Sequence, residues 1–430
     1  MALLIKNVRA IDPSIKLDEV VDIIVRDGKV VEVGHNLSIP KGVSYDYSGK
    51  ILMPGFFDMH VHFRDPGFEY KEDIASGSRA AAAGGFTGVA TMPNTKPTCD
   101  TAEIVAYQIA EAQKENKVKL YPIGAITQGL KGEALSEMGL MAKAGAVGFS
   151  DDGRGVQSAG MLRTAMEYAQ QFSKPLISHC EDESLSNHGV MNESAKSDEL
   201  GLAGWPTIGE NIQIERDIKL AQLTNSKLHI AHLTNAEGME AVRKGKEQGV
   251  AVSCEVTPHH LFLSEDDIDA AYNVNLKMNP PLRTREDMLK LQDGLIRGDI
   301  DCVASDHAPH APHEKDVNFE DSPFGILGLE TSFALIHTNL VANNKMSYDR
   351  LVEVMAINPR KILGLPQVQV KEGSDADFVI VDPLESWVFS EADIYSKSKN
   401  TPFLNYSFIG RVSDTIVNGY FTYQDKQIVE

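Results

Sequence analysis

Histidine and carboxylate side chains in this chain have the types and spacing of metal ligands. His60 and His62 are separated by one residue, so on an extended strand both imidazoles face the same side and can bind one metal ion. A single His-x-His pair is weak evidence, because two exposed or structurally hydrogen-bonded histidines produce the same pattern. The case depends on whether the fold brings further ligands to the same place.

Further candidate ligands follow short apolar runs elsewhere in the chain. They are the pair Asp151-Asp152 and the separate residues His179, His232 and Asp306. Imidazoles and carboxylates together suit Zn²⁺ and related ions. With the first pair, they exceed the ligands of one tetrahedral zinc, which favours two ions ~3.5–4 Å apart, bridged by a carboxylate and a hydroxide. Such a pair would activate water and polarise a carbonyl, which is the chemistry of a metal-dependent hydrolase.

The elements that must position these ligands alternate between short apolar strands and helical stretches. Helices are predicted, for example, over 101–116 and 158–172. The predicted strands are 56–63, 87–94, 119–126, 146–152, 174–182, 227–234, 250–260 and 301–310. Eight such units predict a closed (β/α)8 barrel, an α/β fold whose active site lies at the carboxyl ends of the strands. The candidate ligands occur at those ends. A doubly wound open sheet, the alternative, does not explain polar ends on so many strands.

Both ends of the chain have strand-like patterns instead. Residues 1–54 and 366–430 are rich in alternating and β-branched runs, and the pairs Asp27-Gly28 and Asn418-Gly419 are typical of hairpin turns. We therefore expect the two termini to combine into one small β-sandwich domain. The barrel, residues 55–365, would be inserted between them.

Composition narrows the classes of function. The formal net charge is −20, which argues against a nucleic-acid partner and against an anionic membrane surface. No apolar run is long enough to span a bilayer, and the N-terminus lacks a signal-peptide pattern. The four cysteines form no C-x-x-C pair, so we expect them to be reduced and buried, in a cytoplasmic protein.

Seven motifs, spread in order along the chain, resemble those of one family. They are HFRDPG (62–67), MPNTKP (92–97), GFSDDG (148–153), SHCED (178–182), EVTPHHL (255–261), KMNPPLR (277–283) and SDHAPH (305–310). They resemble the dihydroorotases of the long bacterial type, within the amidohydrolase superfamily. Related cyclic amidases, such as dihydropyrimidinases and allantoinases, place a carboxylated lysine at the end of the fourth strand. This chain has AVGFSDDG there, without a lysine.

The resemblance implies a ligand set. The sequence alone does not separate Asp151 from Asp152, but the family motif favours Asp152 as the residue that bridges two zinc ions together with a hydroxide. The first ion would bind His60, His62, Asp152 and Asp306. The second would bind Asp152, His179 and His232. His229, His259, His260 and His307 are expected to have structural or supporting roles.

The resemblance also implies a substrate-binding set. A planar guanidinium suits a carboxylate, so Arg64 would bind the carboxylate of dihydroorotate, and Asn94 could donate to it. A surface Arg64 paired with Asp65 and a turn-capping Asn94 are the structural alternatives. The remaining positions that match substrate contacts of the family are His62, Asn279, His310 and the backbone of Phe324-Gly325. The polar connection over 309–325 would be a mobile lid or a passive loop.

The implied reaction is the reversible ring opening of (S)-dihydroorotate to N-carbamoyl-L-aspartate, which runs as cyclisation in pyrimidine biosynthesis. Asp306 would accept a proton from the bridging hydroxide and pass it to the leaving ring nitrogen. Two alternatives stay open: another cyclic amidase, and an inactive scaffold for aspartate transcarbamoylase. A homodimer is expected. Whether an active enzyme of this sequence also associates with aspartate transcarbamoylase is left open.

Overall fold

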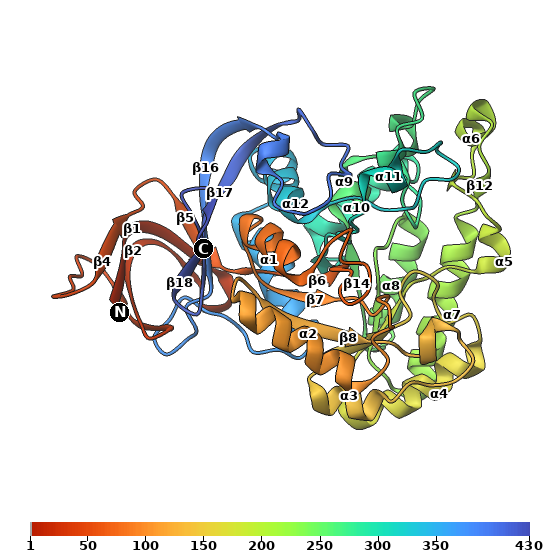
Figure 1. Ribbon diagram of the computed structural model, residues 1–430, viewed down its shortest axis with the longest axis horizontal. Coiled ribbons are helices and arrows are strands. Elements are labelled where there is room, and N and C mark those ends of the chain that lie inside the picture. Colours follow the sequence, from red (N-terminus) through yellow and green to blue (C-terminus); the bar gives the residue numbers. More distant parts are fainter. Residues whose placement is uncertain (1) are drawn as a thin grey trace.

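The computed structural model describes residues 2–430, and its larger part is a barrel of eight parallel strands (Figure 1). Neighbouring strands pair in chain order from β6 to β15, and a parallel bridge from Val61 to His307 joins the first strand to the segment after the last. The backbone N–H of His62 donates to the carbonyl of His307 at 2.9 Å. The strands are β6 (Phe56–Val61), β7 (Phe86–Thr91), β8 (Lys119–Gly124), β9 (Gly148–Ser150), β10 (Leu176–Ser178), β13 (Leu228–Ile230), β14 (Val252–Val256) and β15 (Cys302–Val303).

The eight strands confirm the predicted barrel, and each overlaps its predicted range. Several are shorter than predicted, because the polar residues at their carboxyl ends leave the ladder and enter the loops of the barrel mouth. The site residues Arg64, His232 and Asp306 have φ of 61°, 32° and 48°. Positive φ is costly for residues other than glycine, so the surrounding fold must hold these three backbones in place.

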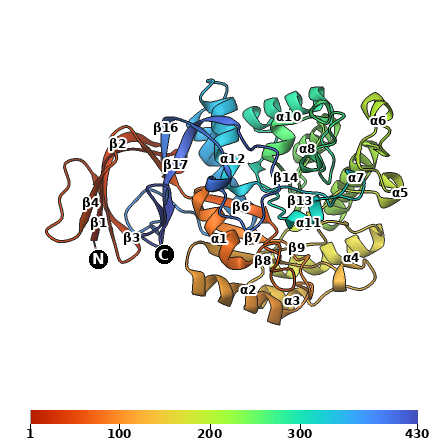
Figure 2. The same cartoon turned by 45° about the horizontal axis from the view of Figure 1, so that its top comes forward.

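Helices surround the barrel (Figure 2). The longer ones are α1 (Ile74–Ala83), α2 (Ala102–Glu115), α3 (Met138–Ala144), α4 (Ala159–Ala169), α7 (Ile208–Thr224), α8 (Ala236–Glu247), α10 (Arg285–Arg297) and α12 (Leu329–Ile336). Shorter helices are α5 (Glu183–Ser186), α6 (Ala195–Leu200), α9 (Pro258–Phe262), α11 (Pro312–Lys315), α13 (Tyr348–Val352) and α14 (Asn358–Ile362). A two-stranded ladder, β11 (Met191–Asn192) with β12 (Gly204–Trp205), extends the loop after β10.

Helix α10 illustrates why these segments are helical. The side chain of Thr284 accepts a hydrogen bond from the backbone N–H of Asp287 and caps the amino end. Leu291 and Leu295 are buried on one face at i, i+4 spacing. The helix ends at Gly298, whose φ of 97° suits glycine.

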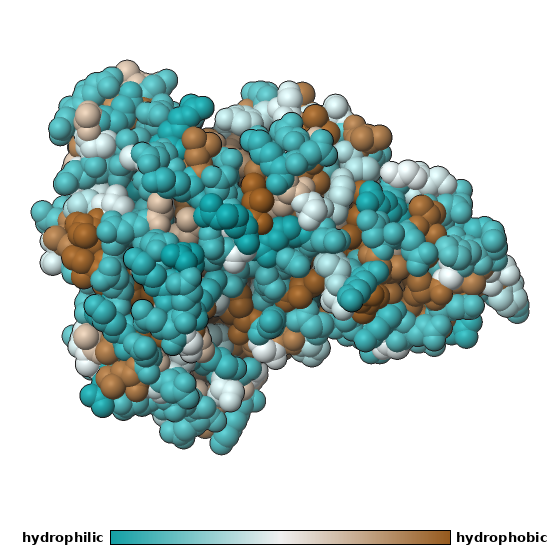
Figure 3. Space-filling model, turned by 180° about the vertical axis from the view of Figure 1, so that it is seen from behind, coloured by the Kyte–Doolittle hydropathy of each residue, from teal (hydrophilic) through white to brown (hydrophobic). Residues whose placement is uncertain are grey.

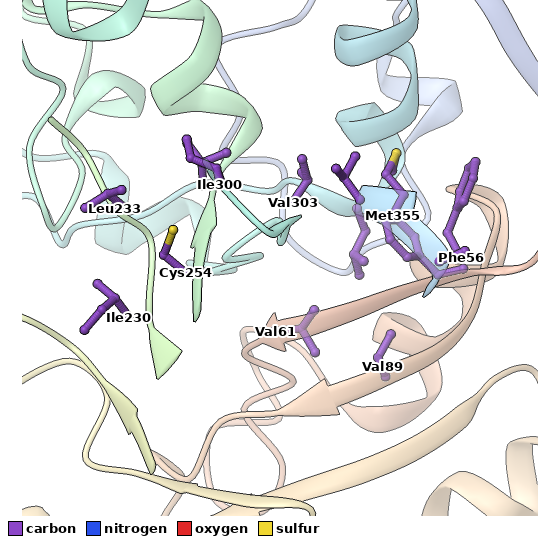
Figure 4. Close-up of a cluster of buried hydrophobic side chains, with 14 of the residues drawn as sticks. Phe56, Val61, Val89, Ile230, Leu233, Cys254, Ile300, Val303 and Met355 are labelled. Atoms are coloured by element: carbon purple, nitrogen blue, oxygen red, sulfur yellow. The ribbon is translucent and has the colours of Figure 1, made fainter. Parts of the chain in front are cut away.

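The main hydrophobic core packs the barrel strands against the surrounding elements (Figure 4). Val61 on β6, Val89 on β7 and Ile230 on β13 are among its buried members. A separate cluster fills the barrel interior, since Phe57 and Met59 meet residues from several other strands. The pairing of β6 with β7 shifts between Asp58 and Val61. Such a bulge lets Phe57 and Met59 fill the interior while His60 and His62 still face the barrel mouth and Val61 packs in the main core.

Strands from both termini form one nine-stranded sheet beside the barrel. Its strands are β1 (Ala2–Asp12), β2 (Leu17–Arg26), β3 (Lys29–Gly34), β4 (Val43–Asp46), β5 (Ile51–Pro54), β16 (Phe378–Val388), β17 (Ser407–Val417), β18 (Tyr420–Gln424) and β19 (Gln427–Ile428). Strand β5 pairs with β16, so the two ends of the chain meet directly. The two predicted hairpin turns connect β2 to β3 and β17 to β18. The domain division at residues 54 and 366 stays a prediction.

The surface is mostly hydrophilic on the face that Figure 3 shows, with small scattered hydrophobic patches. Among residues 2–430, no helix is both long and apolar enough to cross a membrane. All four cysteines are buried and free, as the sequence predicts.

Candidate metal centre and substrate cavity

Asp152 lies at the centre of a group of four histidines at the carboxyl ends of the strands. Its carboxylate oxygens are 3.4 Å from Nε2 of both His60 and His62, 3.5 Å from Nδ1 of His179 and 3.4 Å from Nε2 of His232. All five side chains are buried. The carboxylate of Asp152 is therefore about equally close to all four rings.

Asp306 completes the group from the segment after β15. Its Oδ1 is 2.9 Å from Nε2 of His62 and 3.4 Å from Nε2 of His60. The six side chains that the sequence singles out as ligands therefore converge on one small region. Two overlapping sets have the spacing of a metal site: His60 with His62 and Asp306, and His60 with Asp152 and His232.

The hydrogen bonds of three rings fix which nitrogen faces the centre. Nδ1 of His60 donates to Oε1 of Glu255 at 2.6 Å, and Nδ1 of His62 donates to Oδ1 of Asn94 at 2.8 Å. Nε2 of His179 donates to Oε2 of Glu181 at 3.0 Å. In each neutral ring the other nitrogen is then unprotonated, and its lone pair faces carboxylates and other ring nitrogens.

Such converging acceptors need a cation between them, and the donor set fits divalent zinc or a similar ion. Nε2 of His60 and Oδ1 of Asp152 are buried and have no hydrogen-bond partner among the described residues, which a metal ligand would not need. The structure thus contains a His/Asp cluster that could bind metal. The identity and number of ions belong to the proposal below.

Electrostatics point the same way. Burial opposes ionisation of Asp152, but His60, His179 and His232 lower the pKa of its carboxyl well below the usual value. Burial lowers the pKa of the His60 imidazole, yet Asp152, Asp306 and Glu255 together raise that pKa well above its usual value. The centre therefore stabilises positive charge strongly, whether a proton or a metal ion carries it.

Asp151 and Asp152 have different environments. Oδ1 of Asp151 accepts the backbone N–H groups of Ile126 and Thr127 at 2.8 and 2.9 Å, and its Oδ2 accepts the hydroxyl of Thr127. Asp151 thus caps the end of β8 and faces away from the histidines. Of the two aspartates, only Asp152 is in the ligand group.

Two buried glutamates support the ligands and are absent from the sequence-based set. Glu255 on β14 lies between His60 and His229, and Glu181 follows the ligand His179 by two residues. The acidic residue in the strand sequence VSCEV is the signal that could have identified Glu255. A carboxylate in a buried strand must have a buried partner. Glu181 lies in the motif SHCED and had no comparable signal.

A cavity of about 280 Å³ opens beside the centre, and the other predicted site residues line it. Arg64 is on this wall, and its Nε donates to the carbonyl of Pro309 at 3.3 Å. It does not pair with Asp65, whose carboxylate accepts from Tyr107 instead. Because Oδ1 of Asn94 accepts from His62, the amide nitrogen of Asn94 is its remaining polar group. Arg64 and Asn94 give the cavity hydrogen-bond donors.

Asn279 and His310 give the cavity hydrogen-bond acceptors. Nδ2 of Asn279 donates to Glu181 at 3.4 Å, and Nε2 of His310 donates to the carbonyl of Phe324 at 2.8 Å. Oδ1 of Asn279 and Nδ1 of His310 are left without a hydrogen-bond partner among residues 2–430. Burial, followed by Arg64 and neighbouring lysines, lowers the pKa of His310 to about 2, so its ring is neutral. Gly325 also lines the cavity, but its N–H donates to the carbonyl of Lys277.

Three of the histidines outside the ligand group have partners elsewhere in the fold. His229 contacts Ser253 and Glu255, and Nε2 of His260 donates to the carbonyl of Pro280. His307 accepts the backbone N–H of Gly328 and faces Glu72, away from the metal ligands.

Comparisons with known proteins agree with this geometry. A family model described as dihydro-orotase-like matches residues 49–238. The chain is 48% identical to a dihydroorotase of Geobacter metallireducens over 425 residues, covering 99% of this chain and 100% of that one. It is 44% identical to a dihydroorotase of Solibacter usitatus, covering 97% of each. An L-hydantoinase structure from Arthrobacter aurescens superposes with a TM-score of 0.89 at 27% identity, covering 100% of this chain and 97% of that one.

The barrel and its His/Asp centre define an amidohydrolase, a class of metal-dependent barrel enzymes that hydrolyse cyclic amides among other substrates. Within that class, the family is decided by sequence identity to dihydroorotases over nearly the whole length of this chain and of theirs. The chain belongs to the dihydroorotase family.

Proposed function

We propose that the protein catalyses the reversible hydrolysis of (S)-dihydroorotate to N-carbamoyl-L-aspartate. The observation that carries the proposal is the set of donors and acceptors that line the cavity beside the His/Asp centre. Arg64 and Asn94 offer donors, and Asn279 and His310 offer acceptors. A cyclic imide with a carboxylate presents the complementary groups, because its carboxylate accepts hydrogen bonds and its ring N–H groups donate them.

Two Zn²⁺ ions would be held at the centre, the first by His60, His62, Asp152 and Asp306 and the second by Asp152, His179 and His232. When bound, such ions supply a nucleophile at neutral pH and polarise the scissile carbonyl. The shared position of Asp152 among the four rings supports its role as the bridge.

The protein's own groups orient the substrate and move the proton. Arg64 and Asn94 hold the carboxylate, while Asn279, His310 and the backbone near Phe324-Gly325 border the ring. Burial opposes ionisation of Asp306, but His60 and His62 hold its pKa well below the usual value, so the group starts as a base. Its Oδ accepts the proton of the attacking water and returns it to the leaving ring nitrogen.

The positive charge at the site reconciles an anionic substrate with an acidic chain. Arg64 lies at the cavity wall, and the metal ions would add charge at its base. The net charge of −20 is a property of the whole chain and does not by itself prevent an anion from binding at this site.

The test is turnover of dihydroorotate by the purified protein, with metal content measured on the same sample. Hydantoin and allantoin serve as control substrates, because the fold is shared with a hydantoinase. Opening of either control without turnover of dihydroorotate would refute the proposal. A metal-free protein that stays inactive after zinc is added would instead indicate the scaffold alternative.

Three further statements belong to this proposal. The protein acts as a cytoplasmic enzyme, which four buried free cysteines support. It forms a homodimer, and it can associate with aspartate transcarbamoylase; the family resemblance supports both. Light scattering of the protein alone, and then mixed with the transcarbamoylase, tests them separately.

A further inference from the structure

Glu181 is a buried carboxylate that contacts a residue of the metal centre and a residue of the cavity wall. Its own side chain is not among those that line the cavity. Its Oε2 accepts from Nε2 of His179 at 3.0 Å and from the amide nitrogen of Asn279 at 3.4 Å. Its Oε1 accepts from the hydroxyl of Ser186, on α5, at 2.6 Å. One oxygen thus connects a candidate metal ligand with a residue of the cavity wall.

The chemistry of a carboxylate decides which way the Asn279 amide faces. A carboxylate only accepts hydrogen bonds, so the NH₂ group of Asn279 must point to Glu181. The opposite orientation would place the amide oxygen against the carboxylate oxygen, two acceptors without a proton between them. Oδ1 of Asn279 is left buried and without a partner among the described residues. Because Asn279 is on the cavity wall, a donor group of a bound ligand can supply the partner that this oxygen lacks.

We infer that Glu181 is a specificity-determining positioning residue that makes Asn279 an acceptor for a ring N–H of the substrate. The inference rests on the proposed function and extends it, because it names the residue that selects an imide over analogues without that N–H. A site built to receive an N–H leaves its buried acceptor unpaired when such an analogue binds, and so rejects the analogue.

Glu181 has a second effect through His179. By accepting from Nε2, it leaves Nδ1 of His179 facing Asp152 and His232. Loss of the carboxylate therefore changes metal binding and substrate binding through different partners. An experiment has to separate the two, and the contacts of Glu181 provide the variants that do so.

Four single variants and one double variant test the inference on the zinc-saturated protein. Asn279→Ala removes the acceptor, and Glu181→Met removes the group that orients it at similar side-chain length. Glu181→Gln is the matched control, because its amide oxygen can replace Oε2 while its NH₂ faces the hydroxyl of Ser186. Ser186→Ala removes only the contact with α5. KM, kcat and metal content are measured for dihydroorotate hydrolysis, and folding is checked by thermal melting.

Asn279→Ala and Glu181→Met should each raise KM about tenfold, the usual effect of one lost hydrogen bond. Glu181→Gln and Ser186→Ala should keep KM within about threefold of wild type, and Glu181→Gln should bind zinc less tightly. In the double variant Glu181→Met/Asn279→Ala, KM should equal that of Asn279→Ala alone, because Glu181 acts on the ring only through Asn279.

Three results would overturn the inference: an unchanged KM in Asn279→Ala, KM effects that multiply in the double variant, or a Ser186→Ala variant as impaired as Glu181→Met. The first decides the matter even if Glu181→Met does not fold, because Asn279→Ala leaves Glu181 in place. A wild-type protein that does not turn over dihydroorotate would refute the proposed function instead, so the two failures are distinguishable.

Discussion

Replacement of Glu255 should weaken metal binding without removing any ligand. Its carboxylate is fully buried on β14, 2.6 Å from Nδ1 of His60 and 3.1 Å from Nε2 of His229. It also accepts the backbone N–H of His232 at 3.3 Å. Burial opposes its ionisation, but His60 and His229 lower its pKa to about 2, so it is charged at any working pH.

Glu255→Gln isolates the charge from the geometry. The amide oxygen can still accept from His60, and its NH₂ can face His229, whose ring can turn its proton toward Ser253, 2.8 Å from Nδ1. Only the negative charge behind the His60 ring is lost. Outer partners of this kind change metal affinity about 10–100-fold, and we expect the lower end, roughly tenfold or about 1.4 kcal/mol. Glu255→Ala should be worse, because each buried N–H left unsatisfied costs about 1–3 kcal/mol.

The assay is zinc competition against a chelating indicator, with turnover measured at saturating zinc. Glu255→Gln should recover most of the wild-type kcat once zinc is in excess. The matched control is Glu215→Gln, an exposed glutamate on α7, which removes the same charge far from the centre. Equal zinc affinity in Glu255→Gln and wild type would refute the reasoning, since Glu255 would then only fill space. An equal loss in Glu215→Gln would attribute the effect to net charge.

Four other predictions concern different parts of the molecule. Asp306→Asn should lose nearly all turnover, and metal analysis must show retained zinc before the loss is assigned to proton transfer. Asp152→Asn should lose zinc, whereas Asp151→Asn should keep zinc and lower thermal stability, because Asp151 caps backbone N–H groups; the reverse result would exchange their roles. Arg64→Met should raise KM at least tenfold, since a charged hydrogen-bond donor to the carboxylate is lost, and an unchanged KM would contradict that role. Burial, and then Lys277, lowers the pKa of Lys315 to about 7, whereas the pKa in the unfolded chain is near 10.5. Between these two pH values the folded state binds fewer protons than the unfolded state, so the free energy of unfolding should rise by up to about 1.4 kcal/mol per pH unit. Denaturant unfolding of Lys315→Met should lack this pH-dependent contribution.

The sequence was sufficient for the barrel and for the convergence of the candidate metal ligands, for a physical reason. Each ligand follows a short apolar strand, and parallel strands of a barrel all end at one mouth. Knowing the fold therefore places His60, Asp152 and Asp306 together without any distance being known. The choice between Asp151 and Asp152 needed the structure, because adjacent residues share the same strand end and differ only in which side they face.

The supporting residues could not be found in this way. The importance of Glu255 depends on its contact with His60, which is 195 residues away in sequence. Glu181 contacts Asn279 at a separation of 98 residues. Neither contact follows from the position of one strand end, since each depends on how a side chain from one β/α unit meets a side chain from another.

The same reasoning explains how the chain can select a substrate through groups that orient the side chains of the cavity wall. Asn94 and Asn279 both border the cavity, and an asparagine amide can offer either a donor or an acceptor. At Asn94 the oxygen is engaged by His62, so a donor remains for a carboxylate. At Asn279 the nitrogen is engaged by Glu181, so an acceptor remains for an N–H group. The two residues have the same side chain but opposite hydrogen-bonding polarity toward the ligand. His62 of the metal centre sets the polarity of Asn94. Glu181, which does not line the cavity, sets the polarity of Asn279.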